Sequence, residues 1–163
     1  MNIVQCEHQK ELFMKKVAIL GPLMGKWTLV EPKPDPRTGK IYRSYRGASL
    51  VHPEITKIYN LLYINGKKTL TKEYLEKITS PMALAYWFMD DGSNDGTIAT
   101  NCFTKTECEL LQAWLKETWD IITTIQKNST NQVLHISAKS RKKWDEMIKP
   151  FMLESMMYKL RYK

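Results

Sequence analysis

Hydrophobic and polar residues alternate, or recur at helical spacing, along most of the chain, and this pattern predicts a succession of short strands and helices. In the first part, apolar residues such as Leu12, Phe13 and Val17 share one face of a helix that Gly21 and Pro22 bring to an end. The stretch 31–39 is too rich in proline to join a strand ladder, so it predicts a loop. The elements expected here are a strand at 3–6, a helix ending near 20, strands at 26–30 and 40–50, and a helix at 53–63.

The same order of elements returns later in the chain. The second set is expected as a strand at 97–103, a helix at 106–116, strands at 121–127 and 132–138, and a helix from 140 to 159. Each first strand ends at a cysteine, Cys6 or Cys102, and each last helix is followed by a lysine before a hydrophobic residue, Lys68 or Lys159. We interpret this as a diverged duplication that gives two similar α+β lobes, residues 1–70 and 71–163. The alternative is chance similarity between two short α+β stretches.

The second lobe carries an extra apolar helix at residues 82–92, before its first strand. Ser80 can cap this helix, Pro81 suits its first turn, and Gly92 ends it. Asp90 and Asp91 then stand at the helix C-terminus, where the helix dipole is negative and two adjacent carboxylates repel each other. A divalent cation or lysine side chains would relieve this arrangement, so the pair is a candidate for metal binding. The alternative is that both acids only cap the following turn.

Composition narrows the classes of protein that the chain could represent. The 163 residues, of which 43% are hydrophobic, are enough to build a core without disulfides or a structural metal. The three cysteines form no CxxC pair, and no apolar stretch approaches the length of a membrane span or a signal peptide. We therefore expect a soluble intracellular protein with no membrane partner, from a compartment that the sequence does not identify. The net charge of +8 favours a polyanionic partner such as a nucleic acid.

Four segments together resemble one known family. Residues 84–92 are similar to the signature helix of the LAGLIDADG homing endonucleases and intron maturases, in the branch that includes the omega-intron endonuclease of mitochondria. Residues 65–70, 80–82 and 148–160 resemble the same branch, so the likeness covers nearly the whole chain. The resemblance implies a homing-endonuclease-like α+β fold in which two signature helices pack at the centre and two antiparallel sheets lie along the DNA major groove.

The resemblance also implies an activity and its residues. In this family the last acid of each signature helix holds a divalent metal at the phosphate to be cut, and the two sites together cut both strands of double-stranded DNA. Carried over to this sequence, that acid is Asp91, Asp90 is a secondary ligand, and the metal is Mg²⁺ or Mn²⁺. Lys68 and Lys159 are implied as the basic catalytic residues near the two sites, where they stabilise phosphate charge or help to activate water.

Strand alternation and charge suggest which residues contact DNA, because one face of each sheet packs on the core and the other is left for the groove. The alternative for each of these residues is a polar strand face in water. The predicted DNA-contacting residues are Lys26, Lys33, Arg37, Lys40, Arg43 and Arg46 in the first lobe, and Thr124, Gln126, Gln132, His135, Ser137, Lys139 and Arg141 in the second.

The chain departs from the family pattern at its beginning, since the first lobe starts with its strand rather than with a signature helix. We expect a second chain to supply that helix, either another copy of this protein or a separate polypeptide. Two functions follow from the sequence. One is a site-specific, metal-dependent DNA endonuclease, or one subunit of a split enzyme; the other is a maturase-like or regulatory protein that binds DNA or RNA on the same fold without cutting it.

Overall fold

The computed structural model describes residues 1–128 and 131–162, and the chain divides into two compact units, Met1–Lys57 and Ile58–Lys163. The boundary falls within helix α2 (Pro53–Leu62). Across the described ranges, no helix is both long and apolar enough to cross a bilayer. The lobes 1–70 and 71–163 were predicted from the repeat rather than from compactness, and they stay a prediction.

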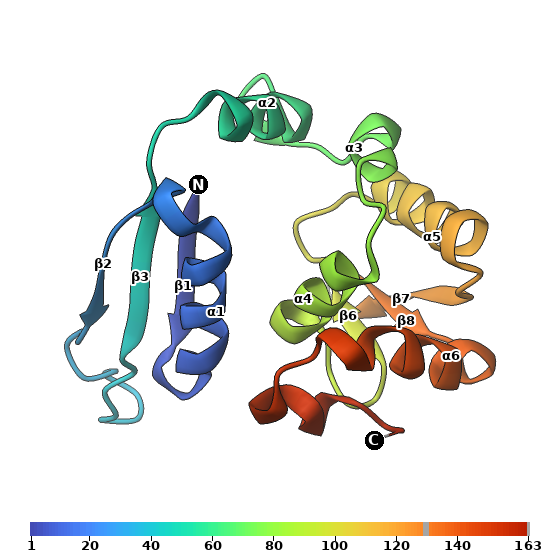
Figure 1. Ribbon diagram of the computed structural model, residues 1–163. Helices are drawn as coiled ribbons and strands as arrows, with labels where there is room; N and C mark the ends of the chain where they lie inside the picture. The colour runs from blue at the N-terminus through green and yellow to red at the C-terminus, as the bar shows by residue number, and fades with distance from the viewer. Residues whose placement is uncertain (129–130, 163) are drawn as a thin grey trace. The chain divides into compact units, whose positions relative to one another are not determined.

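Unit 1 is a three-stranded antiparallel sheet with one helix on one face (Figure 1). Its elements are β1 (Asn2–Cys6), a 3₁₀ turn (Glu7–Gln9), α1 (Lys10–Leu20), a second 3₁₀ turn (Gly21–Leu23), β2 (Met24–Val30) and β3 (Ser44–Ser49). The spatial order is β1-β3-β2. The core is formed by Ile3, Phe13 and Tyr45, with the Phe13 and Tyr45 rings stacked 5.3 Å apart.

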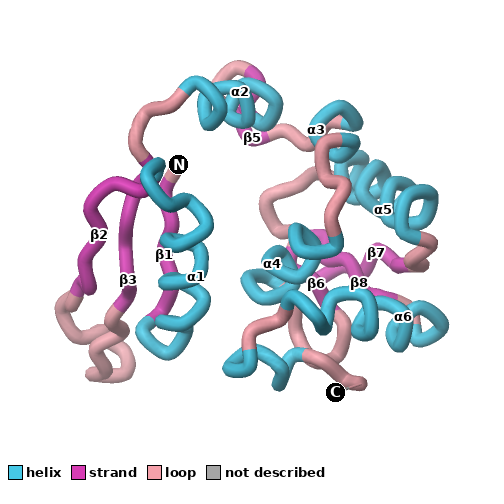
Figure 2. The backbone as a smooth tube through the Cα atoms, in the orientation of Figure 1, coloured by secondary structure: helices cyan, strands magenta, loops and turns pink. Residues whose placement is uncertain are grey.

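Unit 2 contains the larger core, built from a second three-stranded antiparallel sheet and several helices. Figure 2 shows β6, β7 and β8 side by side, with α4, α5 and α6 around them. Buried side chains from all three helices, including Phe88, Trp114 and Trp144, pack with Ile98 and Leu134 of the sheet. The elements are β4 (Tyr63–Ile64), β5 (Lys67–Lys68), α3 (Lys72–Glu76), α4 (Pro81–Asp91), β6 (Thr97–Ala99), α5 (Lys105–Trp119), β7 (Thr123–Asn128), β8 (Asn131–Ile136), α6 (Ala138–Ile148) and two 3₁₀ turns (Lys149–Phe151, Glu154–Lys159).

The predicted repeat of strand, helix, strand, strand, helix is confirmed. Unit 2 has the sheet order β6-β8-β7, in which the third strand of the repeat lies between the first and second, as in β1-β3-β2. The cysteine correspondence is weaker, because Cys6 ends β1 whereas Cys102 lies beyond the end of β6.

Three predicted elements are too long by several residues. The strand predicted at 40–50 is observed only over Ser44–Ser49. The strand predicted at 97–103 ends at Ala99, because Thr100 turns the chain: its carbonyl accepts the Phe103 N–H, and Thr104 already caps α5. The helix predicted from 140 to 159 stops at Ile148 and continues as two 3₁₀ turns. Pro150 has no N–H to donate, so it cannot continue the α-helical hydrogen bonds.

The prediction missed a hairpin and a short helix that follow α2 in the chain and precede α4. Asn65 and Gly66 both have positive φ, 52° and 74°, which is the backbone that a two-residue hairpin turn requires. They join β4 to β5, where Lys68 lies, and Thr71 then caps α3 by accepting the Tyr74 N–H. The Asn-Gly pair was the signal in the sequence that could have revealed this hairpin.

Candidate active site

Helix α4 begins and ends as its sequence predicts. The Ser80 hydroxyl accepts the Met82 N–H, Pro81 occupies the first turn, and the Gly92 N–H closes the last turn on the Phe88 carbonyl. A Cβ at position 92 would collide with the ring of Phe88, which is fully buried. Glycine is therefore needed here for the close approach of the chain to Phe88.

One side of α4 is buried in the core of unit 2 and the other is exposed. Leu84, Ala85, Phe88 and Met89 are buried, whereas the carboxylates Asp90 and Asp91 are on exposed residues at the helix end. The helix therefore uses its apolar face as an anchor and presents the two acids outside the core.

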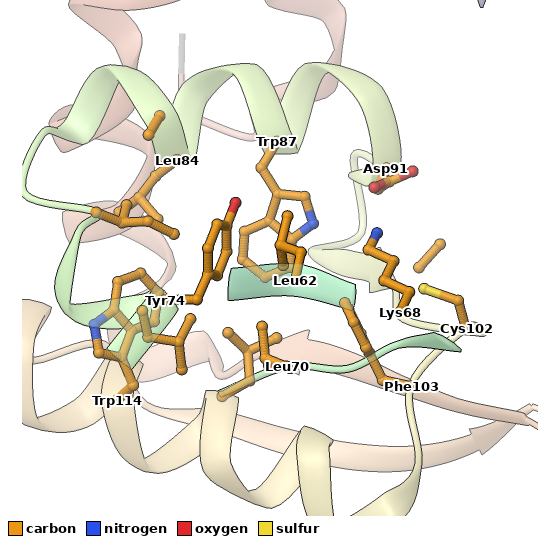
Figure 3. Close-up of a pocket in the computed structure, with 15 residues that line it drawn as sticks. Leu62, Lys68, Leu70, Tyr74, Leu84, Trp87, Asp91, Cys102, Phe103 and Trp114 are labelled. Atoms are coloured by element: carbon orange, nitrogen blue, oxygen red, sulfur yellow. The ribbon is translucent and has the colours of Figure 1, made fainter. Parts of the chain in front are cut away.

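Asp91 borders a pocket that lies entirely within unit 2. The pocket has a volume of about 260 Å³ and is lined mainly by hydrophobic side chains, among them Trp87 of α4 and Phe103. Its charged lining residues are Asp91 and Lys68. Figure 3 shows the Lys68 ammonium group directed toward the Asp91 carboxylate at one end of the pocket. Two of the three predicted catalytic residues thus line the same pocket.

The β4–β5 hairpin positions Lys68. The Lys68 ammonium group also lies 5.2 Å from the centre of the Phe103 ring, which is a cation–π contact. Two residues farther along, the Leu70 N–H donates to the Glu107 carboxylate of α5 at 2.7 Å, which ties the hairpin to that helix. Burial raises the pKa of Glu107, but hydrogen bonds from Thr104 and Leu70 lower it, and the net shift is downward.

Lys159 reaches the same helix end from the C-terminal part of the chain. The residue is only 7% exposed, and its ammonium group donates to the carbonyl oxygens of Met89 at 2.6 Å and Asp90 at 3.4 Å. These carbonyls belong to the last turn of α4, which has no further helical N–H donors and carries the negative end of the dipole. Lys159 thus stabilises the turn that bears Asp91, and both predicted lysines lie near this end of α4, Lys68 on the pocket side and Lys159 at the backbone carbonyls.

The acids of this site suit a hard divalent cation. Among the described residues there is no cluster of three or more His, Cys, Asp or Glu side chains that could enclose a metal. Mg²⁺ is typically held by one or two carboxylates together with waters and substrate phosphate oxygens. Asp90 and Asp91, exposed and adjacent, match that open donor set.

Three of the predicted DNA contacts in unit 2 share one face of its sheet. Thr124 pairs with His135 across β7 and β8, and Gln126 pairs with Val133, so alternation places Thr124, Gln126 and His135 on the same side. This face is opposite to the one on which Leu134 packs into the core. His135 Nε2 donates to the Asp95 carbonyl at 3.0 Å, which fixes its ring.

Other predicted contacts in unit 2 lie elsewhere. Gln132 shares the face of Leu134, by alternation along β8. Ser137 lies beyond β8, and its hydroxyl oxygen is buried without a hydrogen-bond partner among the described residues. Lys139 is exposed near the start of α6.

Arg141 requires a correction, because its predicted contact with DNA phosphate conflicts with its position. The side chain is 2% exposed and paired with Asp145. Periodicity alone did not reveal this, since an i, i+4 ion pair on a helix is usually a surface feature.

The predicted contacts in unit 1 are all on exposed residues, but they occupy different places. Arg46 lies on the sheet face opposite α1, paired with Val4 and Thr28, whereas Lys26 lies in β2. Arg43 precedes β3 and forms ion pairs with Glu31 and Glu7, at 2.6 and 3.8 Å. The others lie in the loop between β2 and β3: Lys33, Arg37 and Lys40.

Comparison with known proteins gives a consistent result. The model of the LAGLIDADG DNA endonuclease family matches residues 1–144. The cytochrome b mRNA maturase bI2 of Debaryomyces hansenii is 33% identical over 127 residues, which cover 75% of this chain and 48% of that protein. The intron-encoded endonuclease ai4 of Dictyostelium discoideum is 33% identical over 126 residues, covering 74% of this chain and 79% of that protein.

A solved structure confirms the fold. The homing endonuclease I-WcaI, bound to its DNA recognition sequence, matches with a TM-score of 0.88 and 22% identity, covering 99% of this chain and 75% of that chain. The α+β fold predicted from the resemblance is thereby confirmed. The chain spans about half the length of the maturase and three quarters of the I-WcaI chain.

Proposed function

Because this chain belongs to the LAGLIDADG DNA endonuclease family, we propose that it binds double-stranded DNA through its two three-stranded sheets and cuts it with Asp91 as the essential acid. The observation that carries the proposal is the convergence of Asp91, Lys68 and Lys159 at the C-terminal end of α4. The relative from Dictyostelium discoideum is named as an intron-encoded endonuclease, which supports a homing-type activity.

Each residue has a role that its position supports. Asp91, with Asp90 as a secondary ligand, would hold Mg²⁺ or Mn²⁺, and the metal when bound would neutralise charge on the phosphate that is cut. Lys68, which lines the pocket with Asp91, would stabilise charge on the same phosphate. Lys159 acts through the backbone, because its ammonium group is engaged with the carbonyls of α4.

We also propose that the site works together with a second signature helix, supplied by another copy of the chain or by a separate polypeptide. The exposed side of α4 supports this, because Met82 on that side is 42% exposed. Sedimentation of the chain alone and with duplex DNA would detect a second copy. Recovery of cutting only after a second polypeptide is added would identify a split enzyme.

The second candidate function is a maturase-like protein that binds RNA without cutting DNA. It is favoured by the similarity to the cytochrome b mRNA maturase, which spans 75% of the chain. The exposed sheet faces would then contact RNA, and Asp91 would have no catalytic role.

Replacing Asp91 separates these functions. We expect Asp91→Asn to lower Mg²⁺-dependent cleavage of a plasmid library of randomised target sequences by more than about 100-fold, because a metal ligand is lost. Duplex affinity, measured in Ca²⁺, should stay unchanged, since no groove contact is removed. Asp90→Asn is the matched control, at the neighbouring position, and should have the smaller effect. Equal cleavage by the Asp91→Asn variant and the unchanged chain would exclude Asp91 as the essential acid.

A further inference from the structure

The core of unit 2 contains a buried ion pair that the proposed chemistry does not use. Arg141 and Asp145 lie one turn apart on α6, with side chains 2% and 0% exposed. The Arg141 Nε donates to both carboxylate oxygens of Asp145, at 2.9 and 3.1 Å. A buried ion pair is often no more stabilising than hydrophobic residues of the same volume, so its presence calls for a specific role.

Both members of the pair also bind the backbone of one segment, residues 158–162. Arg141 Nη2 donates to the Lys159 carbonyl at 3.0 Å. The Asp145 carboxylate accepts the N–H groups of Arg161 and Tyr162, each at 3.0 Å. The ion pair therefore fixes this segment by its backbone, on both sides of residue 160.

Asn94 holds the same segment from the loop that follows Asp91. Its side-chain amide donates to the carbonyls of Tyr158 and Leu160, both at 3.1 Å. The loop also packs closely on Arg141, because a Cβ at Gly96 would lie 2.6 Å from Arg141 Nη1. Segment 158–162 is thus fastened both to α6 and to the loop at residues 92–96.

These contacts direct Lys159 to the end of α4. With its backbone held by Asn94 and Arg141, the Lys159 ammonium group reaches the Met89 carbonyl. That turn carries two adjacent carboxylates at the negative end of a helix dipole, an arrangement that favours fraying unless a cation opposes it. Segment 158–162 supplies that cation as Lys159, and hydrogen bonds with Asn94, Arg141 and Asp145 hold the backbone of the segment in place.

We propose that Asn94, Arg141 and Asp145 are positioning residues of the Asp91 site, which hold Lys159 against the last turn of α4 and thereby fix the Asp91 carboxylate. The inference rests on the proposed function, in which Asp91 is the metal ligand. Groups that orient a metal ligand from behind contribute about 10- to 100-fold to metal affinity or activity in other proteins. The same scale is expected here.

Asn94→Ala is the variant that tests this. Removing Arg141 or Asp145 would leave a buried unpaired charge and endanger folding, whereas Asn94 is exposed and its loss removes only hydrogen bonds. The matched control is Gln112→Ala, because the Gln112 amide likewise donates to a backbone carbonyl, that of Thr123, at 2.6 Å. Both variants lose a side-chain amide donor, but only Asn94→Ala loses it next to the Asp91 site.

Two measurements on the full chain decide the matter. In metal-free protein, we expect faster amide hydrogen exchange in Asn94→Ala than in Gln112→Ala, confined to residues 89–96 and 158–162. In cleavage of the randomised plasmid library, we expect Asn94→Ala to cut about 10- to 100-fold more slowly at limiting Mn²⁺. Its half-saturating Mn²⁺ concentration should rise, while its duplex affinity stays unchanged.

The outcomes are distinct. Unchanged exchange in those two segments overturns the positioning role, and so does faster exchange with unchanged metal dependence, because the coupling to Asp91 would then be absent. If the unchanged chain cuts no duplex at any metal concentration, the proposed function fails first, and the inference fails with it.

Discussion

The two units repeat one topology but bury very different cores. In unit 1, α1 covers the sheet with a small cluster built around Phe13 and Tyr45, whose rings also contact Trp27. In unit 2, three helices pack against the core face of the sheet, and Trp144 and Phe88 meet edge to face within a much larger cluster. A duplicated order of strands therefore fixes the path of the chain without fixing how much apolar surface each copy buries.

The exposed sheet faces differ as well. Unit 1 presents Arg46 beside Thr28, together with a basic loop, whereas unit 2 presents the uncharged pair Thr124 and Gln126 with His135. Since charged contacts to phosphate give affinity and polar contacts to bases give specificity, we propose that the two copies contribute differently to DNA recognition.

The largest expected effect concerns the cores. We expect Phe13→Ala to unfold unit 1 selectively and Trp144→Ala to destabilise unit 2, each by about 3–5 kcal/mol, because both rings are fully buried. Limited proteolysis with mass-spectrometric mapping would show which unit opens. If protease sites in both units became accessible together in either variant, the two cores would not be independent.

An intermediate effect concerns the sheet faces. We expect Arg46→Ala to weaken duplex binding for all sequences and to reduce the slope of log affinity against log salt by about one, since one phosphate contact is lost. Gln126→Ala should leave the slope unchanged and relax sequence preference, at a cost of about 1–3 kcal/mol for the preferred site. Binding titrations at several salt concentrations measure both. Identical salt slopes in the two variants would remove the proposed division of roles.

The smallest effect concerns acid stability. In unit 2, hydrogen bonds from Lys116 and Lys143, together with their charges, lower the pKa of Asp120 from 3.8 to about 2. Because the folded-state pKa is depressed, the stabilisation is present above pH 4 and is lost as the pH falls toward 2. Asp120→Asn should therefore reduce the change in melting temperature that accompanies the fall from pH 4 to pH 2.

Asparagine is the suitable replacement because Asp120 has a positive φ of 52°, which asparagine also tolerates. In unit 1, the pKa of Asp35 is lowered mainly by the Arg37 backbone N–H, so Asp35→Asn serves as the parallel variant. A pH profile that Asp120→Asn leaves unaltered would show that its contacts with the two lysines add nothing to stability.

The sequence by itself determined the elements whose signals are local. Helix α4 could be predicted to within one residue, because its cap Ser80, its first-turn Pro81 and its terminal Gly92 all act within a few positions of the helix. The repeat and the alternation of Thr124, Gln126 and His135 were likewise readable, since side chains in a strand alternate between two faces. The resemblance to a family added the candidate acid, which local patterns alone left open.

Only the tertiary structure decided where the basic side chains near the site lie. Arg141, Lys142 and Lys143 follow one another in the sequence, yet Arg141 is buried while the other two are exposed. Its burial depends on Phe88, whose ring lies 5.5 Å away, and on the carbonyl of Lys159. Lys159 in turn reaches a carbonyl 70 residues earlier in the chain. Periodicity describes the faces of single elements, and it carries no information about which distant backbone groups will fill a buried site.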